Sequence, residues 1–242
     1  MILFDMETSF EKMPDGEPFI CSFSGGKDST IALSMACERG ECKGIIHWFD
    51  EEKNKSVFHA QDQEIIESQS KCMELPLIIS NYTPWSHRLE LIEEYKELAR
   101  QGVKSIIFGD IYIEDSVKLQ QIICKKAGIV PRFPLWKKNY EFLFCEFQKR
   151  NIKTIISRVN ICFLDDKWLG KEYNQETFEQ FEKLGIDQFG EKGEFHTTVV
   201  DADIFKKPLS YRLSDVSKDG NDVKIGLSSH ELQDNVYQLL KY

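Results

Sequence analysis

The sequence has little that would suit secretion, membrane insertion or redox chemistry. Its cysteines number seven, an odd count, and form no C-x-x-C pair. Most lie among apolar residues, where cysteine acts as a small hydrophobic side chain. No apolar run approaches the length of a membrane span, and the acidic start lacks the basic segment of a signal peptide. These absences predict a protein of a reducing compartment, the cytoplasm, with no membrane partner.

Positive charge is scarce as well. Lysine and arginine together number 31 against 40 aspartate and glutamate residues, which gives a net charge of −9. A general nucleic-acid binder needs a basic face, so we expect no nucleic-acid partner beyond, at most, a local tRNA-binding patch. With 242 residues, of which 41% are hydrophobic, the chain can bury the core of one large domain or two modest ones.

The most informative stretch is a glycine turn, Ser24–Gly26, between two regular segments. The residues before it, Phe19–Phe23, form a short apolar run typical of a strand, and helical spacing of apolar residues begins at Lys27. Such a junction directs free backbone N–H groups and the positive end of a helix dipole at one point, which suits an anion. Glycine also permits positive φ and leaves no Cβ in the way of a phosphate. The polar groups available there belong to Ser24, Lys27, Asp28, Ser29 and Thr30.

Counting excludes two familiar phosphate loops. A Walker A loop would need glycine at Cys21 and a serine or threonine at Asp28. The dinucleotide fingerprint G-x-G-x-x-G is also absent. The turn is therefore an anion-binding loop of another type, or a strand–helix connection that happens to be rich in glycine.

Strands and helices alternate over the first two thirds of the chain. This order predicts βαβ units and an α/β fold, a Rossmann-like parallel sheet with helices on both faces. We expect strands at 19–23, 43–50, 75–79, 104–108, near 129 and at 152–156, and helices at 27–40, 61–73, 83–101, 116–127 and 139–149.

From about residue 160 the pattern changes to a smaller α+β part. A helix is expected at 175–184, short strands at 195–200, 209–213 and 223–225, and a closing helix from Ser229. We therefore predict a nucleotide-binding domain over 17–159 and a substrate-binding domain over 160–242.

Three segments should meet at one edge of the parallel sheet. Ligands of such sheets bind beyond the carboxyl ends of the strands. The glycine turn, Asp50 and Gly109-Asp110 all follow predicted strands at those ends. We expect them to line a common crevice.

A second polar motif lies at Gly190–Thr197. Glu191 and Glu194 are three residues apart, flanked by glycines, at the start of a predicted strand. Two such carboxylates suit Mg²⁺ bound to ATP, or an ammonium or amine. His196 titrates near neutral pH when unperturbed and would suit proton transfer. On spacing alone, an ordinary surface turn explains the motif better.

Resemblance to a known family changes that weighting. The Ser-Gly-Gly-Lys-Asp-Ser sequence resembles the pyrophosphate loop of the ATP pyrophosphatases, of the adenine nucleotide alpha hydrolase (HUP) superfamily. The order of the further motifs resembles the diphthine–ammonia ligase family over the whole chain after residue 17. The motifs are Ser24–Thr30, Phe108–Ile111 with Glu114 and Asp115, Pro134–Trp136, Trp168–Lys171, Gly190–Thr197 and Phe205–Pro208. Gln188-Phe189 stands where the family commonly has Pro-Cys, and the version here looks like a bacterial branch.

The resemblance implies an enzyme and assigns roles to its residues. ATP would adenylate a carboxylate, pyrophosphate would leave, and ammonia would displace AMP to give an amide. The implied nucleotide-binding residues are Ser24, Gly25, Gly26, Lys27, Asp28, Ser29, Thr30, Asp50, His59, Gly109 and Asp110. The implied catalytic residues are Lys27, Asp28, Glu191, Glu194 and His196, with Thr197 beside them and Asp28 as a partner of Mg²⁺.

The implied partners are ATP, ammonia and a carboxylate-bearing acyl substrate, and a homodimer is compatible with them. No glutaminase part is recognisable, so we expect free ammonia or ammonia from a partner. Two other functions stay open on the same scaffold. One is a tRNA sulfur-transfer enzyme using Cys124 or Cys162, and the other is a nucleotide-binding protein without catalysis. The acyl group itself, a modified histidine of a translation factor or a small carboxylic acid, is not defined by the sequence.

Overall fold

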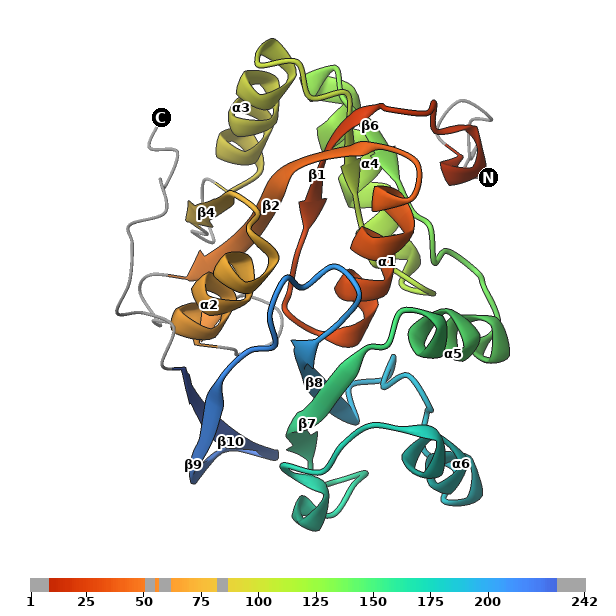
Figure 1. The fold of residues 1–242 in the computed structure, drawn as a ribbon, viewed down its shortest axis with the longest axis vertical. Coiled ribbons are helices and arrows are strands. Elements are labelled where there is room, and N and C mark those ends of the chain that lie inside the picture. The colour runs from red at the N-terminus through yellow and green to blue at the C-terminus, as the bar shows by residue number, and fades with distance from the viewer. Residues whose placement is uncertain (1–8, 51–54, 57–61, 82–86, 230–242) are drawn as a thin grey trace.

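The computed structural model describes residues 9–50, 55–56, 62–81 and 87–229. Within them the chain forms two sheets, one parallel and one antiparallel, with helices around them (Figure 1). The first part contains η1 (Phe10–Lys12), β1 (Pro18–Ser22), α1 (Lys27–Cys37), β2 (Glu41–Asp50), β3 (Lys55–Ser56), α2 (Gln63–Met73), β4 (Leu77–Asn81), α3 (His87–Arg100), β5 (Ser105–Ile107), α4 (Glu114–Ala127), β6 (Val130–Arg132) and α5 (Tyr140–Lys149).

The parallel sheet has the predicted Rossmann-like character. Its parallel strands lie in the order β4-β2-β1-β5-β6, and the short β3 pairs antiparallel with the end of β2. Side chains of β1 alternate between two cores, because successive residues of a strand point to opposite faces. Phe19 and Cys21 pack with α1, α2 and α5, whereas Ile20 packs with α3 and α4. Helices therefore cover both faces, as expected.

The antiparallel sheet follows in the chain. It is built from β7 (Lys153–Asn160), β8 (Phe195–Asp201), β9 (Tyr211–Asp219) and β10 (Asp222–Ser229), in the order β8-β7-β10-β9. The short η2 (Asp166–Trp168) and α6 (Gln175–Lys183) lie between β7 and β8. This is the expected smaller α+β part.

One strand assignment from the sequence is wrong. We expected 152–156 to continue the parallel sheet, but β7 pairs antiparallel with β8 and β10. The apolar run at 152–156 indicates a buried strand and carries no information on the direction of its partners. Sheet membership thus changes between β6 and β7, while the division at residue 159 stays a prediction. The helix starts expected at Thr83 and Ser229 involve residues outside the described ranges.

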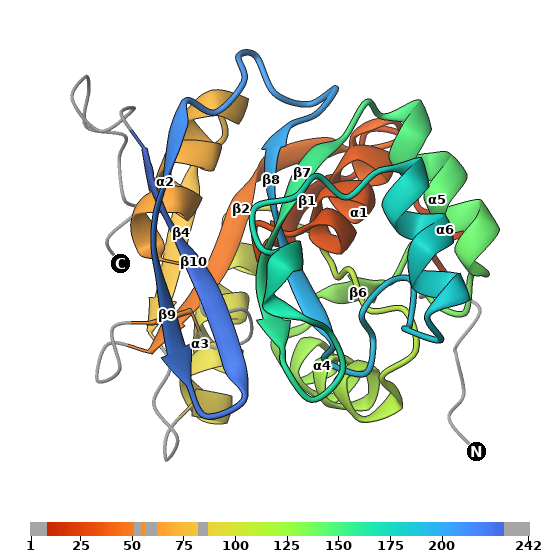
Figure 2. The same cartoon turned by 90° about the horizontal axis from the view of Figure 1, so that it is seen from below.

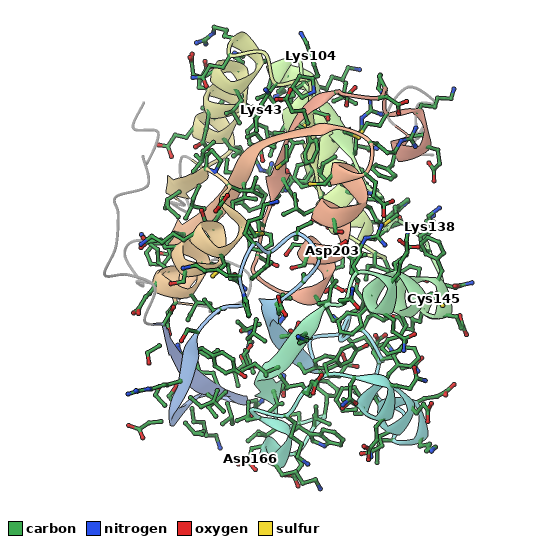
Figure 3. The ribbon with its side chains drawn as sticks, viewed as in Figure 1. Lys43, Lys104, Lys138, Cys145, Asp166 and Asp203 are labelled. Carbon is green, nitrogen blue, oxygen red and sulfur yellow. The ribbon has the colours of Figure 1, made fainter. Side chains whose placement is uncertain are left out.

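The two sheets are joined where the parallel strands end. Figure 1 shows β1 and β2 running toward the second sheet, and Figure 2 places β8 beside α1 and β10 beside α2. The amide of Val199 in β8 donates to Gly25 O at 2.9 Å, and Gln69 Nε2 donates to both Gly25 O and Val199 O, at 3.0 and 2.7 Å. Asp203, which follows β8 and lies beside α1 in Figure 3, accepts from Ser34 Oγ at 2.9 Å.

The described part of the chain has no helix whose length and hydropathy would suit a membrane span.

Candidate active site

The glycine turn has the conformation that its sequence predicts. Gly25 adopts a φ of +81°, and Gly26 is the N-cap of α1. The carbonyl of Gly26 accepts from the Thr30 amide at 3.2 Å and from the hydroxyls of Ser29 and Thr30 at 3.1 and 2.9 Å. The Ser29 hydroxyl also lies 3.0 Å from Ser24 Oγ. The hydroxyl of Thr30 is fully buried, so it braces the turn from within rather than facing an open anion site.

Gly109 completes the wall of the crevice. The sheet order reverses beside β1, between β2 and β5, which is where α/β sheets bind ligands. A Cβ on Gly109 would lie 3.0 Å from Ser29 N and 3.1 Å from Asp28 O, closer than real Cβ atoms approach backbone. The loop after β5 therefore lies against the first turn of α1 only because residue 109 is glycine.

Two further predicted crevice residues lie at the same edge. Asp110 is half-buried, its carboxylate accepts from the Ser116 hydroxyl, and burial raises its pKa. Asp50 is buried as the last residue of β2. The structure thus brings Asp50, Asp110 and the glycine turn together, whereas His59 lies outside the described residues.

Lys27 does not point to the glycine turn. Its side chain is 3% exposed, and its ammonium donates to Phe189 O at 2.6 Å and to Asp28 Oδ2 at 3.0 Å. It lies 5.0, 5.3 and 5.8 Å from the ring centroids of Phe189, Phe195 and Tyr173. We call these two oxygens and three rings the Lys27 cage. The charge that we expected on the phosphate side is thus directed into the second half of the protein.

Asp28 keeps one oxygen without a partner. Its Oδ2 accepts from Lys27, while Oδ1 is buried and has no hydrogen-bond partner among the described residues. Burial raises the pKa of this carboxyl, and the charge of Lys27 opposes the rise. A buried carboxylate oxygen with a vacant lone pair suits a cation.

The 187–194 loop is held by two of its own carboxylates. Asp187 accepts from the amides of Phe189 and Glu191 and from the Tyr140 hydroxyl, at 3.0, 3.3 and 2.8 Å. Glu194 is buried and accepts from the amides of Asp187 and Lys192, at 3.3 and 3.1 Å. Both oxygens of Glu194 are therefore used to fix the loop, which argues for a positioning role instead of the predicted catalytic one.

Glu191 is the carboxylate of the loop that has an oxygen to spare. It accepts from the backbone amide of Tyr112, and its Oε2 is buried without a partner in the described structure. Burial raises its pKa to about 8, the nearby carboxylates of Asp28 and Asp187 add to the rise, and Lys27 opposes it. Such a group changes protonation close to neutral pH and suits proton transfer.

His196 does not titrate in the range that its residue type suggested. Burial, together with the charges of Arg158 and Lys27, lowers its pKa to about 3. The imidazole is therefore neutral across the physiological range, which counts against the exchange of a proton there. Its neighbour Thr197 contacts the glycine turn instead, because Thr197 Oγ1 accepts from the Lys27 amide at 3.1 Å.

Several residues of the site were missed by the sequence analysis. Asp187, Tyr140 and the three rings of the Lys27 cage carry no motif that marks them, because aromatic residues at these spacings are typical of any core. Asp187 stands between Gly185 and Gly190, both with positive φ, which is the one local sign of a constrained loop.

No metal cluster is visible in the residues that the structure describes, as none of their His, Cys, Asp and Glu side chains form a group of three or more suited to an ion. Mg²⁺ needs fewer protein ligands when it arrives with a nucleotide, because the phosphates supply the others. The vacant Oδ1 of Asp28 fits that arrangement.

Comparison with known proteins gives a consistent picture. The description of the diphthamide synthase N-terminal domain matches residues 19–131, and that of the diphthamide synthase C-terminal domain matches residues 139–222. The diphthine–ammonia ligases of Bos taurus and Homo sapiens are 34% and 33% identical over 131 residues, which are 52% of this chain and 48% of each relative. That of Danio rerio is 24% identical over 213 residues, 77% of this chain and 83% of the relative.

The chain thus spans about half the length of the first two relatives. These relatives are vertebrate, so the expected bacterial branch stays a prediction. A solved structure described as a predicted subunit of tRNA methyltransferase from Methanocaldococcus jannaschii overlaps with a TM-score of 0.41 at 12% identity, over 76% of this chain and 97% of that one. That score does not establish a shared fold.

Proposed function

Because the chain belongs to the diphthamide synthase family, we propose that it is an ATP-dependent ligase that joins ammonia to a carboxylate as an amide. The observation that carries the proposal is the contact between Thr197 Oγ1 and the Lys27 amide. It puts the anion-binding turn of one half beside the acidic loop of the other. A ligase needs that proximity, since the activated group and its acceptor must meet in one place.

We infer that ATP is cut between its α and β phosphates. The amides of Gly25–Asp28 and the hydroxyls of Ser24 and Ser29 would hold the pyrophosphate part. A carboxylate oxygen of the substrate attacks the α-phosphorus, and pyrophosphate leaves with the electron pair of the broken P–O bond. Ammonia then attacks the acyl carbon, AMP leaves with the C–O electron pair, and the nitrogen loses a proton.

Mg²⁺ bound to ATP would be held in part by Asp28 Oδ1 and would neutralise charge on the phosphates. Glu191 is the residue suited to accept the proton that the nitrogen loses. Its carboxyl is poised near neutral pH, and its Oε2 has no competing partner in the described part of the chain.

We further propose diphthine as the first acyl substrate to test, because the named relatives are diphthine–ammonia ligases. A small carboxylic acid is the alternative substrate of the same reaction. The sulfur-transfer alternative gains no support. Cys124 is fully buried and burial raises its thiol pKa, while Cys162 is exposed in the turn after β7.

The test is the product of ATP consumption. The purified protein is incubated with α-labelled ATP, Mg²⁺, ammonium and either a diphthine-bearing protein or a panel of carboxylic acids. Release of AMP that requires both ammonium and one acceptor supports the proposal. Formation of ADP and phosphate contradicts it. ATP binding with no AMP from any acceptor would favour a nucleotide-binding protein without catalysis.

A further inference from the structure

The Lys27 cage has the composition of a binding site for a small ammonium ion. It offers one backbone carbonyl, one carboxylate oxygen and three aromatic faces to a single nitrogen, and the nitrogen is almost fully buried. Carbonyl and carboxylate oxygens accept the N–H bonds of an ammonium group, and aromatic faces attract its charge. The side chain of Lys27 itself shows that an R–NH₃⁺ group fits.

The neighbourhood also holds more acceptors than Lys27 uses. Glu191 Oε2 is buried without a partner in the described structure, and the Glu191 carboxyl feels the charges of both Asp28 and Lys27. A lysine ammonium donates three hydrogen bonds, whereas a free ammonium ion donates four and has no carbon chain on its fourth side. The free ion would therefore use acceptors that Lys27 leaves without a partner.

The position of Lys27 links this cage to the nucleotide. Its backbone lies in the first turn of α1, directly after the glycine turn, and its side chain extends from there into the cage. A bound nucleotide would place several negative charges next to that backbone. The phosphates and the cage would then compete for one lysine.

We propose that the Lys27 cage is the binding site of the ammonium substrate, and that Lys27 occupies it until nucleotide phosphates draw its side chain away. The inference rests on the proposed function, which makes ammonia a substrate. It predicts an order of binding, nucleotide before ammonium. It also explains why a lysine of a phosphate-binding turn is buried against the other half of the protein.

The first test uses the unaltered protein. Affinity for Mg²⁺ and α,β-methylene-ATP is measured by calorimetry in ammonium chloride and in potassium chloride at equal ionic strength. Potassium has a similar size to ammonium but donates no hydrogen bonds. The proposal predicts that ammonium tightens nucleotide binding at least about fivefold, because binding sites that favour each other do so reciprocally. Equal affinities in the two salts would overturn it.

The second test needs no nucleotide. In Lys27→Ala the cage is empty, so ammonium chloride should raise the thermal unfolding midpoint above that in potassium chloride, with saturation. In Lys27→Met an apolar side chain fills the cage, and the difference should vanish. Lys171→Ala is the matched control, since Lys171 also lies over an aromatic ring, 4.7 Å from the centroid of Trp168, but is exposed. An equal response in all three variants, or none in Lys27→Ala, would overturn the proposal.

These outcomes separate the inference from its premise. If the nucleotide does not bind in either salt, the proposed function fails, and the Lys27→Ala measurement still decides whether the cage accepts ammonium. If the nucleotide binds equally in both salts, the proposed function stands and the ammonium site is wrong.

Discussion

The ammonium group of Lys27 donates a hydrogen bond to the backbone carbonyl of Phe189 at 2.6 Å. The two residues are 162 positions apart in the chain. Lys27 begins the helix that follows the glycine turn, and Phe189 lies in the loop that carries Glu191. A residue of the anion site therefore holds the loop on which the second half of the chemistry depends.

Loss of this lysine should weaken the fold. Lys27→Met keeps most of the apolar stem but leaves Asp28 and Phe189 O without their donor. Breaking a buried ion pair from one side costs about 3 kcal/mol, and urea unfolding would measure it. Lys171→Met, at an exposed lysine, should change the free energy of unfolding by less than about 0.5 kcal/mol. Equal losses in both variants would show that the contact contributes no stability.

Gly109→Ala should impair nucleotide binding. The added Cβ would meet the backbone at Ser29 N and Asp28 O, and backbone cannot move aside cheaply. We expect at least about a tenfold loss of ATP affinity, measured by calorimetry, since a small displacement of binding groups has large effects. Gly128→Ala is the control, because Gly128 has a φ of +73° but open space around it. It should lower stability by about 1 kcal/mol and leave ATP affinity unchanged.

Glu191 should make stability fall with rising pH. Its folded pKa is about 8, above the ordinary value of 4.5, so between these values the folded state binds more protons than the unfolded state. Stability is therefore fully present below about pH 4.5 and is lost as pH rises toward 8. Glu191→Gln removes this dependence. Thermal unfolding should show the variant gaining about 1–3 kcal/mol over the parent at pH 9 relative to pH 4. Parallel pH profiles for the two proteins would contradict the assignment.

Glu194→Gln should act differently from the change at Glu191. A glutamine offers one acceptor oxygen where Glu194 serves two amides, so one amide would face an N–H group. The free energy of unfolding should fall by about 1–3 kcal/mol. Turnover per folded molecule should stay within a fewfold of the parent, whereas Glu191→Gln should lose most of it. Loss of turnover in a fully stable Glu194→Gln would instead restore Glu194 as a catalytic residue.

The sequence alone was sufficient for the parts of the fold that rest on local signals. The apolar run before Ser24, the two glycines and the helical spacing after Lys27 predict β1, the turn and α1, and the structure confirms them. The convergence of Gly109 on this turn was also predictable, because parallel strands end at one edge. The direction of β7 was not, since an apolar run does not reveal its partners.

The arrangement around Lys27 could not be predicted in the same way. The Lys27 cage is assembled by contacts between distant segments, and nothing in the local sequence of Tyr173, Phe189 or Phe195 distinguishes them from ordinary core residues. The roles of Glu191 and Glu194 also required the structure. The two occur in one motif, yet one fixes the backbone and the other keeps an oxygen without a partner in the described chain.

The central claim is that a carboxylate is activated by transfer of AMP. The most direct measurement follows ¹⁸O from the carboxylate of the acceptor that supports AMP release. Attack of a carboxylate oxygen on the α-phosphorus predicts one ¹⁸O atom in the AMP phosphate after amide formation, detected by mass spectrometry. AMP without ¹⁸O, or label found in orthophosphate released with ADP, would contradict the account.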